Sequence, residues 1–374
     1  MLKILKDRTA VKRIRKSMAF ARLRQRFPMR EPQVVDDSAR IEDAEVVRID
    51  WPEEVPKPRV GIVRDVEKFP RWTKYRRFLE YNGFPYGLYD LHAHDWIERA
   101  RPFDVVVGLV SNETDRLQET RVKYHFLESY LGKACYPSAS QALLYENKCL
   151  EAYIATACGL PFATTHISHR KEDALAMLEA ARFPLVSKVN GSSGSIGVEL
   201  VRTPREARRI IRQAFSKAGR SIHVPWFRQK DYVYFQEYVP NDGYDIRVIL
   251  TGDRAFGYYR KVLKGDFRAS GMNTVERREL PEEAIRVART VRQHVRGPLL
   301  VVDMVRGLDG RYVIIEYSIV CLHDRAEDLQ VDGVPGVYVI GDDGAVRFEK
   351  GRYWFHEFAL RQFLLDDYLP RCRG

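Results

Sequence analysis

Short β-branched runs alternate with helical stretches near the start of the sequence. In chain order they are a strand at 59–64, a helix at 73–82, a strand at 85–89, a helix at 95–100 and a strand at 103–109. Parallel strands need a crossover connection, usually a helix, so this alternation is typical of a parallel sheet. We therefore predict a parallel α/β domain over residues 59–140.

The pattern changes further along the chain. A helical spacing over 142–158 ends at Gly159-Leu-Pro161, and from residue 183 onward most strands are joined by hairpin turns such as 251–254 and 307–310. The expected strands are 183–189, 199–202, 233–239, 245–251, 255–262, 299–305 and 311–317, with helices at 171–182 and 204–217. We predict a central subdomain over 141–240, a C-terminal subdomain over 241–320 and an extension over 321–374. The extension carries a hairpin over 337–347 and a helix over 354–367, and has no functional assignment.

Composition excludes several classes of protein. The 374 residues are 45% hydrophobic and 30% charged, as in ordinary globular proteins, so disorder and collagen are excluded. The five cysteines are scattered without a C-x-x-C pair, which argues against a disulfide framework or a zinc site. No apolar run approaches the roughly 20 residues of a membrane span. The expected location is the cytoplasm.

Charge is concentrated at the N-terminus. Residues 1–30 contain eleven Lys and Arg residues and one acid, a net charge of +10 out of the formal +11 of the chain. An apolar stripe runs along the same segment through Ile4, Val11, Ile14, Met18 and Ala21. An amphipathic basic helix suits an anionic membrane surface, here the inner face of the membrane, whereas nucleic acid would leave the apolar stripe idle. A helix docked on the protein or a solvated tail are the open alternatives, and residues 31–58 suit a proline-bearing linker.

A glycine- and serine-rich loop separates two expected strands. It reads Asn190-Gly-Ser-Ser-Gly-Ser-Ile-Gly197, where glycines permit close approach of the backbone and serines add hydroxyls for phosphate oxygens. It fits neither the dinucleotide fingerprint nor the Walker loop. On these residues alone a plain hairpin turn remains an alternative.

Two acids interrupt apolar strands. Asp303 follows Leu-Leu-Val-Val, and Glu316 follows Tyr-Val-Ile-Ile on the next strand. A buried carboxylate is costly unless it is paired or binds a cation, so the two residues fit a Mg²⁺ site. A buried salt bridge to Arg247 or Arg260 is the alternative.

Together with basic residues along the chain, these motifs resemble the ATP-grasp superfamily, in particular the branch containing the ribosomal-protein glutamate ligase and glutathione synthetase. The resemblance covers residues 59 to about 320. It implies an α/β and α+β fold with an N-terminal parallel α/β domain, a small lid subdomain and a C-terminal mixed-sheet subdomain. It also implies ATP and Mg²⁺ as cofactors.

The resemblance assigns roles residue by residue. Nucleotide contacts would come from Lys148, Lys188, the lid residues Ser192, Ser193, Gly194 and Ser195, the adenine hinge Gln236, Glu237, Tyr238 and Val239, the ribose contact Asp245, and Arg268. Catalytic contacts would come from Arg247, Lys261 and Arg268, and metal ligands from Asp303, Glu316 and Ser318. Ser318 departs from the family's usual Glu-x-Asn, because a serine hydroxyl is a shorter and poorer ligand than an amide carbonyl.

The implied reaction is an ADP-forming ligation. A carboxylate attacks the γ-phosphate of ATP, and an amine then displaces phosphate from the acyl phosphate to form an amide. A phosphotransferase on the same fold and a nucleotide-binding protein without catalysis are the alternatives. A small-molecule or envelope-precursor carboxylate and an amine are the expected substrates, and neither is identified by the sequence.

Overall fold

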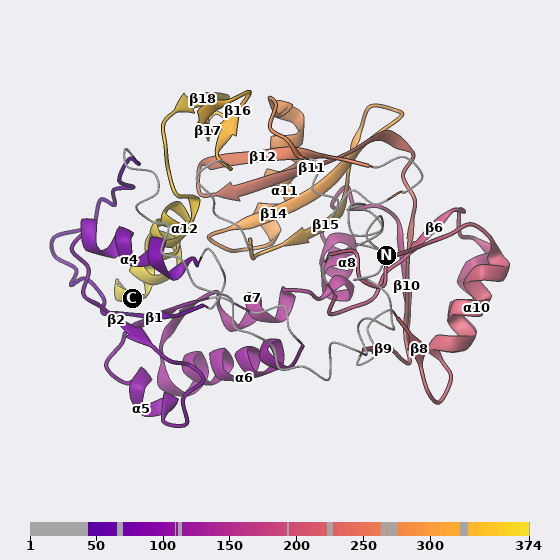
Figure 1. The fold of residues 1–374 in the computed structure, drawn as a ribbon, viewed down its shortest axis with the longest axis horizontal. Helices are drawn as coiled ribbons and strands as arrows, with labels where there is room; N and C mark the ends of the chain where they lie inside the picture. Colours follow the sequence, from indigo (N-terminus) through magenta and orange to yellow (C-terminus); the bar gives the residue numbers. More distant parts are fainter. Residues whose placement is uncertain are drawn as a thin grey trace, which may run out of the picture. The chain divides into compact units, whose positions relative to one another are not determined.

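The computed structural model describes residues 44–65, 70–108, 110, 114–192, 194–222, 227–262, 267, 275–321 and 328–373 (Figure 1). These residues form two compact units, which we call the small unit (162–240) and the large unit (44–161 with 241–373). The basic arm predicted over residues 1–30 lies outside the described residues. Within the described part of the chain, no helix is both long and apolar enough to cross a bilayer.

The first part of the large unit is a parallel sheet with strand order β2-β1-β3-β4. Its elements are β1 (Val60–Val63), α4 (Trp72–Tyr81), β2 (Tyr86–Tyr89), α5 (Trp96–Ala100), β3 (Val105–Val107), α6 (Thr114–Leu131), β4 (Ala134–Tyr136), α7 (Ala139–Leu144) and α8 (Lys148–Ala157). The predicted parallel α/β arrangement is therefore confirmed. One helix was expected over 142–158, but α7 and α8 are separate, and Glu146 between them has a left-handed φ of 57°.

The second part of the large unit is an antiparallel sheet with the path β15-β14-β11-β12-β17-β16. Its elements are β11 (Asn241–Thr251), β12 (Arg254–Lys261), β13 (Val275–Glu276), α11 (Glu282–His294), β14 (Leu300–Gly307), β15 (Tyr312–Ser318), β16 (Gln330–Val331), β17 (Val334–Ile340), β18 (Val346–Lys350) and α12 (Phe355–Phe363), with short turns of helix over Leu364–Tyr368 and Leu369–Cys372. All strand pairings described for this sheet are antiparallel, where a mixed sheet was expected.

A continuous hydrophobic core joins the two sheets of the large unit. It includes Val60 of β1, Val301 of β14 and Phe355 of α12. In Figure 1, α12 of the C-terminal extension lies beside α4, and the two helices are in contact. Val47 is buried in the same core, so the part of the expected linker that is described packs against the large unit.

The small unit has its own antiparallel sheet, with order β5-β10-β6-β7, and its own core. Its elements are β5 (Thr165–Ser168), α9 (Lys171–Ala176), a 3-10 turn (Met177–Glu179), β6 (Leu185–Ser187), β7 (Glu199–Val201), α10 (Pro204–Ala214), β8 (Arg220–Ser221), β9 (Arg228–Gln229) and β10 (Val233–Glu237). Thr203 caps α10 by accepting from the Glu206 N–H, and Pro204 occupies the first turn. The apolar face of α10 then packs on β10 and β7. The domain boundaries predicted from sequence stay a prediction.

Candidate active site

The two acids predicted as metal ligands are direct neighbours across the sheet. Asp303 of β14 pairs with Glu316 of β15, and on its other side Asp303 pairs with Arg247 of β11. Directly opposed residues of antiparallel strands project from the same face. Arg247, Asp303 and Glu316 therefore form one row across three strands.

Asp303 is held by two arginines. Its Oδ1 accepts from Arg247 Nε at 2.7 Å, and its Oδ2 accepts from Arg247 Nη2 at 2.7 Å and Arg260 Nη2 at 2.8 Å. Burial by itself raises the pKa of this carboxyl, but Arg247 and Arg260 outweigh burial and hold the pKa of Asp303 well below its usual range. The buried salt bridge left open by the sequence is present, and it involves both arginines.

Asp245 shares one of these arginines. Arg260 donates from Nε to Asp245 Oδ1 at 2.6 Å and from Nη2 to Oδ2 at 2.8 Å. Both side chains are buried. The ribose contact predicted for Asp245 is untested, and this bidentate ion pair is the contact that the structure gives it.

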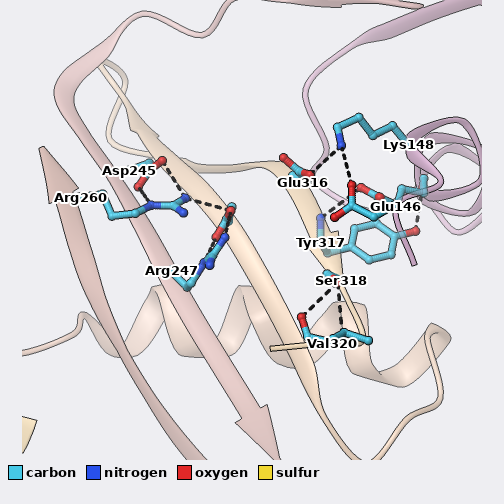
Figure 2. Close-up of polar contacts among 11 residues, drawn as sticks. Glu146, Lys148, Asp245, Arg247, Arg260, Glu316, Tyr317, Ser318 and Val320 are labelled. Carbon is cyan, nitrogen blue, oxygen red and sulfur yellow. Dashed lines mark hydrogen bonds and ion pairs between the residues drawn. The ribbon is translucent and has the colours of Figure 1, made fainter. Parts of the chain in front are cut away.

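Lys148 approaches the row from α8 (Figure 2). The helix begins at Lys148 because Asn147 caps it, accepting from the Leu150 N–H. Lys148 Nζ lies 3.0 Å from Glu316 Oε1 and 3.7 Å from Glu146 Oε2. Burial lowers the pKa of this amine, but Glu316, Glu146 and Glu151 outweigh burial and keep the pKa of Lys148 above its usual value. Lys148 is therefore a charged ammonium at neutral pH.

Tyr317 ties α8 to β15. Its hydroxyl donates to the Glu151 carbonyl at 2.7 Å, and its N–H donates to Glu151 Oε2 at 3.4 Å. Glu316 directly precedes Tyr317, and Lys148 lies one turn before Glu151 on α8. The contact between Tyr317 and Glu151 therefore holds Lys148 and Glu316 close to each other. Sequence reasoning missed Glu146 and Glu151. The signal for Glu151 in the sequence was its spacing, an acid about one turn after Lys148 on the expected helix.

Lys261 is the last residue of β12 and follows Arg260. Successive strand residues face opposite sides of a sheet, and the catalytic role of Lys261 stays a prediction. Lys261 is exposed, and its Nζ lies 5.6 Å from the centroid of the Tyr244 ring. Arg260 is the basic residue of this strand that reaches Asp303.

Of the three predicted metal ligands, the two carboxylates have oxygen atoms that could bind a divalent cation. Asp303 Oδ1 accepts one described hydrogen bond and so keeps a lone pair, and the Glu316 side chain is 38% exposed. The Ser318 hydroxyl makes a local contact, 3.2 Å from the Val320 nitrogen and 3.3 Å from the Val320 carbonyl oxygen (Figure 2), and its role as a metal ligand stays a prediction. Among the described residues there is no group of three or more His, Cys, Asp or Glu side chains that could hold a metal.

The glycine-rich loop of the small unit contains several residues in the left-handed conformation. Gly191, Gly194, Ser195 and Gly197 all have left-handed φ values. At Gly197 a Cβ would lie 2.7 Å from a Val189 methyl group, so a side chain there would clash. The Ser192 hydroxyl donates to the Val189 carbonyl at 2.7 Å. This hydrogen bond stabilises the turn at the start of the loop.

Lys188 directly follows β6, and the predicted adenine hinge begins at the end of the neighbouring strand β10. Lys188 is buried, with Nζ 6.0 Å from the Tyr234 ring centroid. Gln236 Nε2 donates to Thr165 Oγ1. The N–H groups of Glu237 and Tyr238 donate to the carbonyls of residues 164 and 184, so in this arrangement these two positions offer adenine their carbonyls only. For Val239 we keep the hinge role as a prediction.

Two predicted residues fall outside the described part of the chain. They are Ser193 of the loop and Arg268, predicted as both a phosphate contact and a catalytic residue.

Comparison with known proteins decides the family. Residues 139–332, just over half of the chain, match the family model of the RimK-like ATP-grasp domain. The chain belongs to this family. The predicted membership of the ATP-grasp superfamily is thereby confirmed. The matched segment of this ATP-grasp chain contains Lys148, Asp303 and Glu316.

Curated relatives of this ATP-grasp chain are ligases. The alpha-aminoadipate–LysW ligase LysX of Saccharolobus solfataricus is 24% identical over 67% of this chain and 89% of its own length. The ribosomal protein bS6–L-glutamate ligase of Escherichia coli is 31% identical over 42% of this chain. That second match spans half the length of the bS6 ligase.

Solved structures agree on the fold. The D-alanine–D-alanine ligase from Bacillus anthracis complexed with ATP has a TM-score of 0.50 at 19% identity, covering 71% of this chain and 87% of that one. The D-cycloserine synthetase DcsG has a TM-score of 0.51 at 15% identity, covering 70% of this chain and 91% of that one. The predicted ATP-grasp fold is confirmed.

Proposed function

We propose that this chain is an ADP-forming, ATP-dependent carboxylate–amine ligase. A substrate carboxylate attacks the γ-phosphate of ATP, which gives an acyl phosphate and ADP. An amine then attacks the acyl carbon, and phosphate leaves as the amide bond forms. The ligase names of the curated relatives and the family membership both support this proposal.

The observation that carries the proposal is the row of Arg247, Asp303 and Glu316 with Lys148 against it. Phosphoryl transfer depends mainly on positioned charges, and this row supplies two carboxylates, a guanidinium and an ammonium on one face of a rigid sheet. We propose that Asp303 and Glu316 hold Mg²⁺, which when bound would spread the charge of the nucleotide phosphates. Lys148 would exchange its contact with Glu316 for a phosphate oxygen, and Arg247 would orient the substrate carboxylate.

In the small unit we propose Lys188 as a second phosphate contact and the 190–197 loop as a cover for the nucleotide. Loops of this kind exclude water from reactive intermediates. The left-handed glycines and the buried position of Lys188 support the proposal. The hinge Gln236–Val239 would hold adenine, and Asp245 would face the ribose only after releasing Arg260.

The test is a screen for ADP and phosphate released together. Amino acids, dipeptides and sugar acids would be offered as carboxylates with and without amines, starting from glutamate and aminoadipate because relatives are named for them. A ligase releases ADP and phosphate in equal amounts when both substrates are present. ADP without phosphate would identify a phosphotransferase, and ATP binding without any product would identify a protein that only binds nucleotide.

We further propose that residues 1–30 bind an anionic membrane surface and that the substrate is an envelope precursor. The net charge of +10 and the apolar stripe support this proposal. The test is co-sedimentation with vesicles of phosphatidylglycerol and phosphatidylcholine. The full chain should sediment at low salt and a chain lacking 1–30 should not, whereas equal sedimentation of the two would refute the proposal.

A further inference from the structure

The glycine-rich loop of the small unit connects two strands whose ends pair with each other. Ser187 ends β6, Glu199 begins β7, and the two residues lie opposite one another across the antiparallel pair. The loop over residues 190–197 therefore leaves and re-enters the sheet at neighbouring points. A side chain that holds both Ser187 and Glu199 would hold both ends of the loop.

Arg220 contacts both of these residues. Its Nη1 donates to Ser187 Oγ at 3.0 Å, and its Nη2 lies 2.8 Å from Glu199 Oε1. Nη1 also donates to Gln229 Oε1 at 2.7 Å. Because Arg220 belongs to β8 and Gln229 to its paired strand β9, one guanidinium joins this hairpin to both ends of the loop.

Arg220 is buried although its guanidinium is permanently charged. It is 3% exposed, and Ser187 and Gln229 are fully buried, whereas the Glu199 side chain is 48% exposed. A buried charge is costly unless its partners are well placed, and buried hydrogen-bond networks hold their members in one arrangement. The contacts of Arg220 therefore make a rigid point at the base of the loop.

The hairpin that carries Arg220 also packs against the loop itself. A Cβ on Gly191 would lie 3.5 Å from the Phe227 ring, and a Cβ on Gly197 would lie 3.6 Å from Ile222 Cδ1. Both apolar side chains come from the segment between β8 and β9. They lie beside the first and the last glycine of the loop, so the hairpin supports the loop at both ends.

A left-handed glycine determines where this hairpin begins. Gly219 has a φ of 69°, and a Cβ there would lie 2.9 Å from the Gln229 carbonyl oxygen. A side chain at this position would therefore push β8 away from β9. Arg220 is the next residue and pairs with Gln229 across the hairpin, so the close approach at Gly219 fixes the position of Arg220.

The backbone beside Ser187 is held as well. Lys188 directly follows Ser187, and its N–H donates to the Tyr234 carbonyl of β10 at 3.2 Å. Two residues later, the Asn190 N–H donates to the Tyr232 hydroxyl at 2.8 Å. Any shift of Ser187 would therefore shift Lys188, the proposed phosphate contact of the small unit.

We propose that Arg220 is a positioning residue that keeps the glycine-rich loop in an arrangement ready to bind the phosphates of ATP. This role rests on the proposed function of the loop as a cover for the nucleotide. A loop that is already held at both ends loses less conformational entropy when it closes on a ligand, so it binds that ligand more tightly. Arg220 acts through the loop and Lys188 and does not itself contact ATP.

The experiment compares the binding of ATP and of adenosine to the full chain by calorimetry in the presence of Mg²⁺. Arg220→Met should weaken ATP binding about tenfold, because it removes the guanidinium that holds the loop, and should leave adenosine binding unchanged. Arg220→Lys should regain part of the ATP affinity. The matched control is Arg228→Met, an exposed arginine of β9 in the same hairpin, which should bind both ligands like the wild type.

Hydrogen exchange gives a second readout that needs no nucleotide. In Arg220→Met the amides of residues 188–198 should exchange about tenfold faster than in the wild type, while those of β10 keep their rate. Glu199→Gln covers the case in which Arg220→Met does not fold, because Glu199 is partly exposed and this change removes one contact. It should speed exchange in the loop to a smaller extent, and Glu179→Gln, at an exposed acid of the small unit, should not.

Three results would overturn the inference. One is an equal loss of ATP and adenosine affinity in Arg220→Met, and another is faster exchange throughout the small unit, because both would show that Arg220 only stabilises the unit. The third is wild-type ATP affinity in a folded Arg220→Met variant.

The proposed function can fail separately. If the wild type does not bind ATP, the loop is not a cover for the nucleotide, and the role of Arg220 in ATP binding fails with it. Hydrogen exchange would then still decide whether Arg220 holds the loop.

Discussion

Asp303 and Glu316 face each other across β14 and β15, yet they neutralise different cations: Asp303 binds two guanidiniums, and Glu316 binds the Lys148 ammonium. The two acids also differ in burial. The Asp303 side chain is 7% exposed and the Glu316 side chain is 38% exposed. We therefore expect the two acids to respond differently to substitution.

Asp303→Asn should destabilise the protein. It leaves Arg247 and Arg260 partly uncompensated, and breaking a buried charge cluster costs roughly 3–5 kcal/mol. Urea unfolding measures this as a lower free energy of unfolding. The control is Asp309→Asn in the turn of the same hairpin, whose partner Arg311 is exposed and which should change stability by about 0.5 kcal/mol or less. Equal stability of Asp303→Asn and wild type would contradict the account.

Glu316→Gln should keep the protein folded and strongly reduce ADP release. The side chain is partly exposed, so its loss costs little packing, but the site loses a carboxylate that the proposed reaction needs. We expect ADP release to fall about 100-fold or more, with a smaller loss of stability than in Asp303→Asn because Glu146 still lies 3.7 Å from Lys148. The control is Glu282→Gln, an exposed acid of α11. Full turnover by Glu316→Gln would remove this residue from the mechanism.

Tyr317→Phe should reduce turnover by loosening a contact. The lost hydroxyl donates to the Glu151 carbonyl, a buried bond worth about 1 kcal/mol. Because this bond ties α8 to β15, ADP release should fall severalfold and KM for ATP should rise. Tyr130→Phe, on an exposed tyrosine of α6, is the matched control. A loss of stability with unchanged kinetics would show that the contact is only structural.

Glu357 of α12 should make stability depend on pH. Burial raises the pKa of Glu357 to about 7, although the ion pair with Arg77 opposes this shift. A glutamate in the unfolded chain has a pKa of about 4.3. Between these values the folded protein binds more protons than the unfolded chain, so the stabilising contribution is complete below about pH 4.3 and is lost as pH rises through 7.

Urea unfolding at pH 5 and pH 8 measures this effect. The wild type should lose stability relative to Glu357→Gln between the two pH values, because glutamine does not titrate. Glu282→Gln should follow the wild type. Parallel pH profiles for wild type and Glu357→Gln would show that Glu357 does not titrate in this range.

The sequence was informative where local rules apply. The position of Asp303 and Glu316 on neighbouring antiparallel strands follows from two apolar runs joined by a short turn at 308–310. Their direct pairing does not, because the turn pairs Met304 with Ile314 and a register shift next to Asp303 then brings Glu316 opposite it. The side of the sheet on which Arg260 lies could also be predicted. A two-residue turn at Gly252-Asp253 pairs Thr251 with Arg254, and the same register pairs Asp245 with Arg260.

Contacts between segments far apart in the chain could not be predicted from the sequence. Lys148 meets Glu316 because α8 packs on β15, and no local pattern links residues so far apart in the chain. The helix α6 was missed because its apolar residues do not form one stripe. The packing of α12 on α4 also joins segments that are far apart in the chain, and no sequence pattern predicted it.

The most direct test of the ligase proposal is the stoichiometry of ADP and phosphate in wild type and Lys148→Met, with the exposed Lys171→Met as control. With a carboxylate and an amine present, the account predicts equal ADP and phosphate from wild type and Lys171→Met, and a loss of both products in Lys148→Met. ADP without phosphate, or full turnover by a folded Lys148→Met variant, would contradict it.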